Sequence, residues 1–294
     1  MPEMPEVQGL VDYLRSKLLP PDAPAMAIDD VEVLSFPVLK TAAVPLEELY
    51  TGPVSDVERR GKFLVVTAGG VHLVMHLAKA GWLRWSDALK PGRLRPGRGA
   101  MALRVRFAAE DGSAQPGFDL TEAGTRKSLA VYVVRDLADV PGIARLGPEA
   151  LDVDPAAFAE LVASHHGQIK GLLRDQAVIA GIGNAYSDEI LHAAHLSPFA
   201  IGAKLGPAEV QRLFEAMGAV LESAIENAAG RPAAELKDSK RQAMRVHART
   251  GEPCPVCGDT VREVAFADSS LQYCPTCQTG GKLLADRRMS RLLK

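Results

Sequence analysis

The sequence lacks any long uninterrupted run of apolar residues. Its 294 residues are 47% hydrophobic and 24% charged, which is ordinary for a globular protein. No apolar run approaches the roughly 18–20 residues that span a bilayer. The opening Met-Pro-Glu-Met-Pro-Glu is acidic and proline-rich, unlike a secretory signal. We therefore expect a cytoplasmic protein that does not contact membranes. The chain is long enough for two or three domains.

The sequence also lacks an excess of basic or acidic residues, because 34 Lys and Arg are balanced by 36 Asp and Glu, which gives a formal net charge of −2. This balance argues weakly against nucleic acid, since DNA-binding proteins usually carry a basic footprint. Net charge is a sum over all faces, however, and basic residues do cluster locally. They gather at 84–99, 237–249 and in the tail after Cys277. A solvated loop or tail without function is the alternative for the first and last of these clusters.

Cysteine is rare, and its few copies are bunched. The four form two Cys-x-x-Cys pairs with 16 residues between them: Cys254, Cys257, Cys274 and Cys277. In a cytosolic protein such a cluster binds metal more often than it forms disulfides. Four thiolates complete a closed tetrahedral shell, so we expect one structural Zn²⁺ in a zinc ribbon with strands at 261–266 and 271–273. Four free thiols are the alternative.

Hydrophobic periodicity divides the rest of the chain into two parts. Residues 7–18 have helical spacing, and 63–67 and 71–75 read as a hairpin about Gly69-Gly70. Alternation at 103–107 and 129–134 adds strands, which together suggest a β-sandwich. After Pro141 the pattern becomes helical, with helices expected at 155–163, 169–176, 184–195 and 207–228.

A glycine turn separates two of these helices, in the run Ala180-Gly181-Ile182-Gly183-Asn184. The glycines allow a tight turn with exposed amides, and Asn184 is a good N-cap for the next helix. Such a turn can hold a phosphate on backbone N–H groups. The alternative is a turn that merely connects two helices.

The N-terminus offers a second candidate site. Pro2 follows the initiator methionine, whose removal would leave a secondary amine able to attack an aldehydic carbon and form an iminium ion. The terminal amine has an intrinsic pKa of about 8, so a useful fraction is neutral. Glu3 beside it could move protons. Many proteins begin Met-Pro-Glu without any such chemistry, and a retained Met1 would block it.

Five motifs occur together and in one order, and the set resembles the formamidopyrimidine-DNA glycosylase and endonuclease VIII family over nearly the whole chain. They are Pro2 to Val7 (catalytic N-terminus), Arg60 to Phe63 (DNA-contacting lysine), Leu146 to Glu149 (interdomain signature), Gln176 to Glu189 (helix–two-turns–helix) and Gly251 to Cys254 (start of the zinc ribbon). The resemblance implies an α+β multidomain protein. We expect an N-terminal β-sandwich with flanking helices at 1–136, a helix–two-turns–helix domain at 150–240, the zinc ribbon at 245–281 and a basic tail at 282–294.

The resemblance also implies a base-excision-repair glycosylase with abasic-site lyase activity that flips the damaged nucleotide out of the duplex. Pro2 would attack C1′, Glu3 would manage protons, and β- then δ-elimination would cut the strand. Lys62 would act near the sugar or phosphate. DNA contacts would come from Lys79, Arg126, Gly183, Asn184 and Tyr186. The expected partner is damaged double-stranded DNA, bound at the nucleoid by a monomer without an organic cofactor.

Two positions depart from the family pattern. The family often has His-Leu-Gly-Met-Ser-Gly, whose methionine fills the gap left by the flipped base, whereas this chain has His76-Leu77-Ala78-Lys79-Ala80-Gly81. Lysine cannot wedge into a base stack as an apolar side chain does. In the ribbon, Ser269 replaces a phosphate-binding arginine. The alternatives are therefore a catalytically weak damage-binding paralogue and a generic zinc-ribbon nucleic-acid module. The preferred lesion stays open among oxidised purines, oxidised pyrimidines, and alkylated or bulky bases.

Overall fold

A computed structural model describes residues 1–41, 43–95, 97, 99–109, 115–124, 127–267 and 269–285. Arg126 and the part of the expected basic tail from residue 286 onward lie outside the described residues. The chain forms two compact units, Met1–Arg145 with Ala228–Lys237, and Leu146–Asn227 with Asp238–Lys294. Among the described residues, no helix is both long and apolar enough to cross a membrane.

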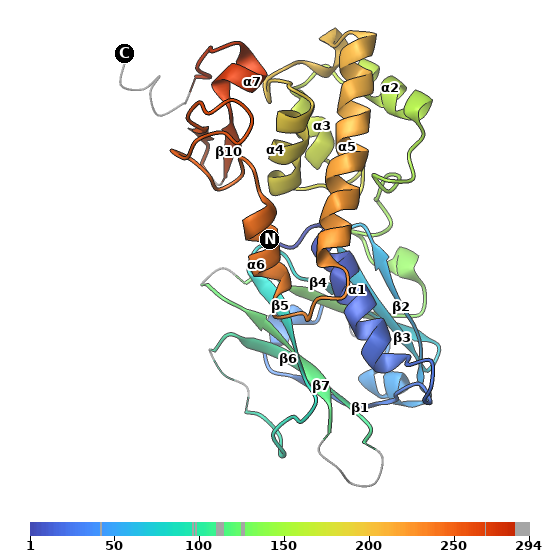
Figure 1. The fold of residues 1–294 in the computed structure, drawn as a ribbon. Helices are drawn as coiled ribbons and strands as arrows, with labels where there is room; N and C mark the ends of the chain where they lie inside the picture. The colour runs from blue at the N-terminus through green and yellow to red at the C-terminus, as the bar shows by residue number, and fades with distance from the viewer. Residues whose placement is uncertain are drawn as a thin grey trace. The chain divides into compact units, whose positions relative to one another are not determined.

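The first unit is built on two four-stranded antiparallel sheets (Figure 1). One sheet has the order β1 (Ile28–Val33), β6 (Met101–Phe107), β7 (Gly117–Glu122), β5 (Gly81–Ser86). The other has the order β2 (Val54–Arg60), β3 (Phe63–Ala68), β4 (Val71–His76), β8 (Ala130–Val134). Helix α1 (Met4–Leu18) packs against β2 and β3, and short 3-10 helices η1 (Phe36–Val38), η2 (Leu46–Tyr50) and η4 (Leu137–Asp139) complete the unit.

One apolar core joins the two sheets and α1. Alternate residues of the strands point inward, as a half-buried sheet requires. Leu64 and Val66 of β3, Val105 of β6 and Leu120 of β7 all belong to this core, as does Leu10 of α1. The expected β-sandwich, N-terminal helix and hairpin are thus confirmed, with Ala68 paired to Val71 across Gly69-Gly70.

The second unit contains the helices and the ribbon. Its elements are α2 (Pro155–Ser164), α3 (Ile169–Arg174), α4 (Asn184–Ala193), η5 (Gly202–Lys204), α5 (Pro207–Ala228), α6 (Leu236–Ala243), β9 (Arg262–Ala265), β10 (Ser270–Tyr273) and α7 (Pro275–Thr279), with the last residue of α5 and the first two of α6 assigned to the first unit. α3 ends before the expected residue 176, where the Asp175 side chain accepts a hydrogen bond from Ala177 N and starts a turn. α4 ends at Ala193, and His195 then adopts the left-handed φ of 53°.

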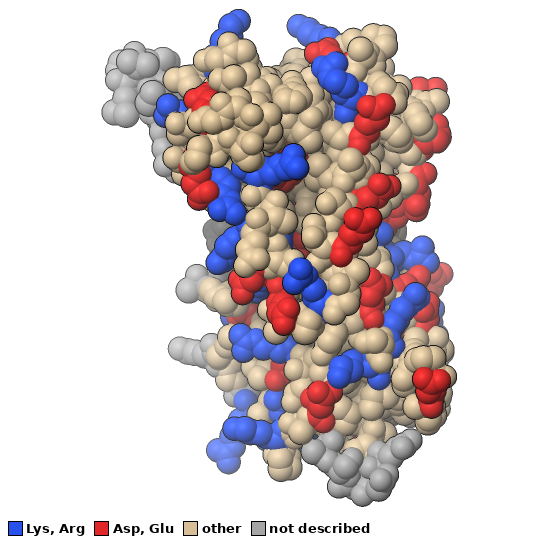
Figure 2. Space-filling model, viewed as in Figure 1, with Lys and Arg blue, Asp and Glu red and all other residues tan. Residues whose placement is uncertain are grey.

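Charge is mixed over the face drawn in Figure 2, where basic and acidic side chains alternate over short distances. Helix α5 carries an acidic series, visible as red side chains along it. Its sequence contains four glutamates and one arginine: Glu209, Glu215, Glu222, Glu226 and Arg212. Because phosphate repels this charge, α5 is a poor surface for DNA.

Candidate functional sites

The N-terminal residues expected to be catalytic lie at the buried start of α1. Pro2 is buried and the Glu3 residue is only 1% exposed. Glu3 is the N-cap, and Glu6 forms a capping box with it by accepting a hydrogen bond from Glu3 N at 2.8 Å. Pro5 stands in the first turn, where its missing N–H costs nothing. The cap therefore fixes the backbone on which Pro2 and Glu3 stand.

Hydrogen bonds connect this helix to the hairpin that carries Lys62. Arg59 of β2 donates through Nε to the Gln8 side chain at 3.2 Å and through Nη1 to the Gly61 carbonyl at 2.9 Å. Gly61 and Lys62 form the two-residue turn between β2 and β3, and Gly61 has the positive φ of 56° that favours glycine. Lys62 is only 7% exposed. The first turns of α1 and Lys62 are thus tied to the same end of this sheet.

His76 lies at the same end of the sheet. No sequence signal of its own pointed to this residue. It pairs with Phe63 across β3 and β4, with ring centroids 4.7 Å apart. Burial, and then the positive charge of Lys62, lower the pKa of His76 to about 4. His76 is therefore neutral at physiological pH.

Strand register brings Lys79 to this end as well. Because β3 and β4 are antiparallel, the residue after His76 leaves the sheet where Lys62 enters it. Lys79 lies in the following turn and is exposed. Ala78 before it has a φ of 51°, a conformation that costs a residue with a Cβ about 1–2 kcal/mol. The first unit thus places Pro2, Glu3, Lys62 and Lys79 toward one end of the sandwich.

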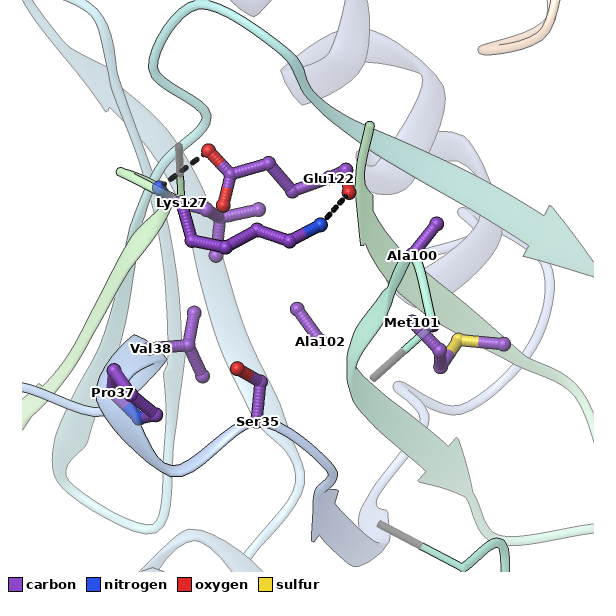
Figure 3. A pocket seen from close by; sticks show the side chains of 10 residues that line it. Ser35, Pro37, Val38, Ala100, Met101, Ala102, Glu122 and Lys127 are labelled. Atoms are coloured by element: carbon purple, nitrogen blue, oxygen red, sulfur yellow. Dashed lines mark hydrogen bonds between the residues drawn. The ribbon is translucent and has the colours of Figure 1, made fainter. Parts of the chain in front are cut away.

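The loop after β7 also reaches this end, because β8 begins with Ala130 opposite His76. Glu122 organises its far side by accepting from Ser128 N at 2.7 Å and Leu129 N at 3.0 Å, while Lys127 Nζ donates to the Glu122 carbonyl. Glu122, Lys127 and Leu129 line a small hollow with Ser35, Pro37, Val38, Gly99, Ala100, Met101 and Ala102 (Figure 3). Both charged side chains engage the loop itself, so we assign the hollow no ligand.

In the second unit, Gln176 holds the glycine turn between α3 and α4. Its side chain donates to the Ile182 carbonyl at 2.7 Å and accepts from Gly181 N at 3.0 Å. Gly181 has a φ of 101°, so glycine is required there. The expected signature segment packs on this turn, with Gly147 N donating to the Gln176 carbonyl at 2.9 Å. Sequence reasoning missed this role of Gln176, because side-chain bridging leaves no periodic signal.

Asn184 is not the N-cap of α4, contrary to our expectation. Gly183 is the cap, and Asn184 is the first helical residue. The Asn184 side chain points elsewhere because its Nδ2 donates to the Ser270 carbonyl of β10 at 2.8 Å. Its buried Oδ1 has no hydrogen-bond partner among the described residues. Tyr186, in the first turn of α4, is 4% exposed, and Lys240 Nζ lies 4.5 Å from the centroid of its ring.

A buried ionic network lies directly beside this turn. Lys170 Nζ bonds to Asp188 Oδ1 at 2.7 Å, to Ser187 Oγ at 2.6 Å and to the Asn184 carbonyl at 3.1 Å. Asp188 Oδ2 also lies 2.8 Å from His247 Nδ1. The network therefore holds α3, the start of α4 and the segment before the ribbon in one arrangement.

Glu189 fastens the same segment to α4. Its carboxylate accepts from the backbone N–H groups of Arg245, Val246 and His247 at 2.8–3.0 Å. Burial raises the pKa of Glu189, although these three hydrogen bonds act in the opposite direction. Asp188 and Glu189 were covered by the motif but not recognised individually as structural anchors.

The four cysteine sulfur atoms lie within 4.8 Å of one another. Cys254 and Cys277 Sγ are 3.9 Å apart, and Cys257 and Cys274 Sγ are 3.3 Å apart. A tetrahedral zinc with Zn–S of about 2.3 Å requires sulfur separations of about 3.8 Å, so the cluster fits the ion after small shifts of the sulfur atoms, which include an opening of the second pair. The expected strands are confirmed as β9 and β10, and Ser269 lies in the turn between them, where its carbonyl accepts from Phe266 N at 2.8 Å.

Burial raises the pKa of Cys274 to about 11, so zinc must displace protons from the thiols it binds. Zinc at this site would hold the two knuckles together. A side chain outside the ligand set also approaches it, since His192 Nε2 of α4 lies 3.3 Å from Cys254 Sγ. Burial is the main reason that the pKa of His192 is lowered to about 4.

Three family models match successive parts of the chain. The formamidopyrimidine-DNA glycosylase N-terminal domain matches residues 1–128, and the formamidopyrimidine-DNA glycosylase H2TH domain matches residues 146–235. The zinc finger found in FPG and IleRS matches residues 251–280.

Two curated relatives match nearly the whole chain, and a third matches about half of it. A formamidopyrimidine-DNA glycosylase of Symbiobacterium thermophilum is 35% identical, with 98% of this chain and 93% of the relative covered. One of Geobacillus kaustophilus is 32% identical, with 95% and 100% covered. A formamidopyrimidine-DNA glycosylase-like protein of Mycobacterium tuberculosis is 63% identical over 158 residues, which are 54% of this chain and all of the relative.

Solved structures share the fold. The Lactococcus lactis FPG (MutM) in complex with FAPY-dG-containing DNA has a TM-score of 0.77 at 23% identity, covering 94% of this chain and 100% of that one. The Lactococcus lactis Fpg complex with abasic-site-containing DNA has a TM-score of 0.77 at 24% identity, covering 94% and 99%.

Proposed function

The chain belongs to the formamidopyrimidine-DNA glycosylase family, and on that premise we propose that it excises damaged bases from double-stranded DNA and cleaves the resulting abasic site. The observation that carries the proposal is the buried Pro2-Glu3 start of α1, tied through Gln8 and Arg59 to the hairpin of Lys62. A capped helix start gives the terminal amine a fixed position, which covalent catalysis on a flipped nucleotide requires.

The chemistry starts at the secondary amine that Pro2 carries once Met1 is removed. The neutral amine attacks C1′, the N-glycosidic bond breaks, and the base leaves with a proton supplied by an acid group. The C1′–O4′ bond then opens as O4′ takes up a proton, which leaves an iminium between the proline nitrogen and C1′. This iminium acidifies C2′, so loss of a C2′ proton expels the 3′ phosphate, and loss of the C4′ proton in a further elimination expels the 5′ phosphate. Glu3, next to the amine, is the group that we assign to proton transfer.

The remaining residues would contact DNA. Lys62 would neutralise a phosphate near the lesion, and Lys79, exposed in its turn, would contact a phosphate or base edge. Arg126 is assigned to the same group from the sequence alone. In the second unit, Gly183, Asn184 and Tyr186 would form a phosphate site at the start of α4, where backbone N–H groups and the helix dipole favour an anion.

Borohydride trapping tests the proposal, because it reduces an iminium to a stable amine. We expect the chain with a processed N-terminus to form a covalent complex with abasic-site duplex DNA in the presence of borohydride. The matched control is the same chain with a peptide fused ahead of Met1, which removes the reactive amine and should trap nothing. Absence of a trapped species from a sample whose intact mass proves Pro2 to be first would refute the proposal.

A second candidate is a damage-binding paralogue with weak catalysis, and two substitutions favour it. Lys79 stands where the family often has a wedging methionine, and Ser269 stands where it usually has an arginine. Under this alternative, damaged DNA is bound selectively while turnover is slow. Single-turnover excision on a panel of oxidised, alkylated and bulky lesions distinguishes the two candidates.

We further propose that the protein acts as a monomer, without an organic cofactor, in the cytoplasm and at the nucleoid while bound. Chromosomal DNA as the substrate supports the location. For the domains, we propose 1–136 for the catalytic sandwich, 150–240 for the helical domain and 245–281 for the ribbon, followed by a basic tail at 282–294. The three family matches fall within or close to these ranges.

A further inference from the structure

His192 lies on the last turns of α4 and faces the zinc ribbon. It is 1% exposed, and its Nε2 lies 3.3 Å from Cys254 Sγ. Its Nδ1 is buried and has no hydrogen-bond partner among the described residues. A buried imidazole with one nitrogen on a metal-ligand sulfur is an uncommon arrangement, because buried polar groups are usually paired at both ends.

The surroundings decide which nitrogen carries the proton. If Nδ1 carried it, a buried N–H would lack an acceptor, and the Nε2 lone pair would face the lone pairs of sulfur. If Nε2 carries it, the N–H points at Cys254 Sγ, and the unpaired Nδ1 is only an acceptor. Because an unsatisfied buried donor is costly and an anionic thiolate is a strong acceptor, the Nε2–H tautomer is favoured.

Other contacts hold the same end of α4 against the second knuckle. Gln278 Nε2 donates to the Leu196 carbonyl at 2.9 Å, and Gln278 Oε1 accepts from Cys274 N at 2.9 Å. His195 Nδ1 lies 3.3 Å from the Cys277 carbonyl. Neither the Gln278 contact nor the His195 contact between α4 and the ribbon ends on a ligand sulfur, whereas the His192 contact does. His192 is therefore placed to influence the metal itself.

We propose that His192 donates a hydrogen bond from Nε2 to the Cys254 thiolate of the zinc-loaded ribbon, and that it thereby raises zinc affinity and joins the metal site to α4. A hydrogen bond withdraws electron density from the thiolate and stabilises it as an anion. Loss of such outer-shell partners typically lowers metal affinity about 10–100-fold.

The experiment measures zinc affinity by competition with a chromophoric chelator, and the charge-transfer band of the Co²⁺-substituted full-length chain. His192→Phe keeps a ring but has no donor, and we expect at least about ten-fold weaker zinc binding. Its sulfur-to-cobalt band should move to longer wavelength, because the thiolate becomes a better electron donor. His192→Gln places an amide N–H near the Nε2 position, and should restore both affinity and band.

The matched control is His195→Gly, because glycine adopts the positive φ of this residue without strain. The substitution removes a contact to a ribbon carbonyl and no contact to sulfur. It should leave zinc affinity and the cobalt band unchanged. The proposal is overturned if His192→Phe keeps the parent's affinity and band, or if Phe and Gln weaken binding equally with an unshifted band. If His192→Phe fails to fold, His192→Asn takes its place, because the asparagine amide is too short to reach the sulfur. It is compared with His192→Gln by zinc affinity and by the cobalt band.

Discussion

At the scale of single residues, Glu3 has two separable roles. Its backbone N–H is held by Glu6, and its position as N-cap fixes the start of α1. The assigned proton transfer requires an ionisable group, whereas capping requires only an acceptor oxygen. A substitution that removes the ionisable carboxyl group of Glu3 but keeps an acceptor oxygen of the same size therefore separates the two roles.

We predict that Glu3→Gln slows base excision about 100-fold or more, the usual contribution of a general acid or base. Stability and DNA affinity should change little, because the amide oxygen still accepts a hydrogen bond. Single-turnover kinetics and equilibrium DNA binding measure the two effects. Glu6→Gln is the control, since it perturbs the same capping box without touching the proposed proton carrier. Equal losses in both variants would mean that Glu3 acts through the cap alone.

Ala78 offers a second residue-scale prediction, because it adopts a φ of 51° in the turn before Lys79. The Cβ of alanine strains this conformation, and glycine removes the strain. We expect Ala78→Gly to raise the free energy of unfolding by about 1 kcal/mol in urea titrations. Ala80→Gly, in the same turn without positive φ, should give no gain. A loss of stability in Ala78→Gly would contradict the strain.

At the scale of elements, the pairing of β3 with β4 buries His76 and thereby makes the free energy of unfolding depend on pH. The pKa of His76 is lowered from 6.5 to about 4 by burial and by Lys62, so the unfolded chain binds a proton more readily than the folded one. The contribution of neutral His76 to the free energy of unfolding is therefore fully present above pH 6.5 and is lost as the pH falls toward 4. The slope contributed by this group approaches 1.4 kcal/mol per pH unit, which is the value for one proton.

His76→Phe should flatten that slope while keeping the ring contact with Phe63. Urea unfolding at several pH values between 7 and 4 measures it. His72→Phe is the control on the same strand and should retain the steeper parent slope, because it leaves His76 in place. If His76→Phe loses stability with acid as steeply as the parent, His76 is not the responsible group.

The junction of α3 and α4 depends on the buried pair Lys170 and Asp188. The Lys170 side chain is 4% exposed and that of Asp188 is fully buried. Removing the lysine leaves the buried Asp188 carboxylate without its ammonium partner and with His247 as its remaining contact, so we predict that Lys170→Met costs about 3–5 kcal/mol of unfolding free energy. The double variant Lys170→Met with Asp188→Leu should recover part of this loss. A single variant as stable as the parent would show that the pair contributes no net stability.

These elements also show what the sequence could and could not predict. Local signals were sufficient for the β3–β4 hairpin, since Gly69-Gly70 and the alternating strands encode it directly. They were misleading for Asn184. Asparagine is a common N-cap residue, but the side chain of Asn184 donates its hydrogen bond to the Ser270 carbonyl of β10 instead. That partner lies 86 positions away in the chain, and no local propensity reports such a contact. His76 was missed for the same reason, because its altered pKa arises from burial and from Lys62.

At the scale of the whole molecule, one short segment packs with a different unit from the helix that precedes it. Residues 228–237 follow a long helix of the second unit, yet they pack with the first, where Trp82 Nε1 donates to the Ala233 carbonyl at 3.1 Å. Lys237 Nζ lies 4.5 Å from the centroid of the Trp82 ring. Composition gives no sign of this return, because it depends on tertiary packing between distant segments.

The terminal amine of Pro2 is the nucleophile that we propose, and mapping the trapped adduct identifies the atom that attacks the sugar. The borohydride-reduced complex with abasic-site DNA is digested with nuclease and protease, and the modified peptide is identified by mass spectrometry. We predict that the sugar remnant is found on the nitrogen of Pro2, in a peptide that lacks Met1. An adduct on Lys62, or on any other lysine with Pro2 unmodified, would contradict the account.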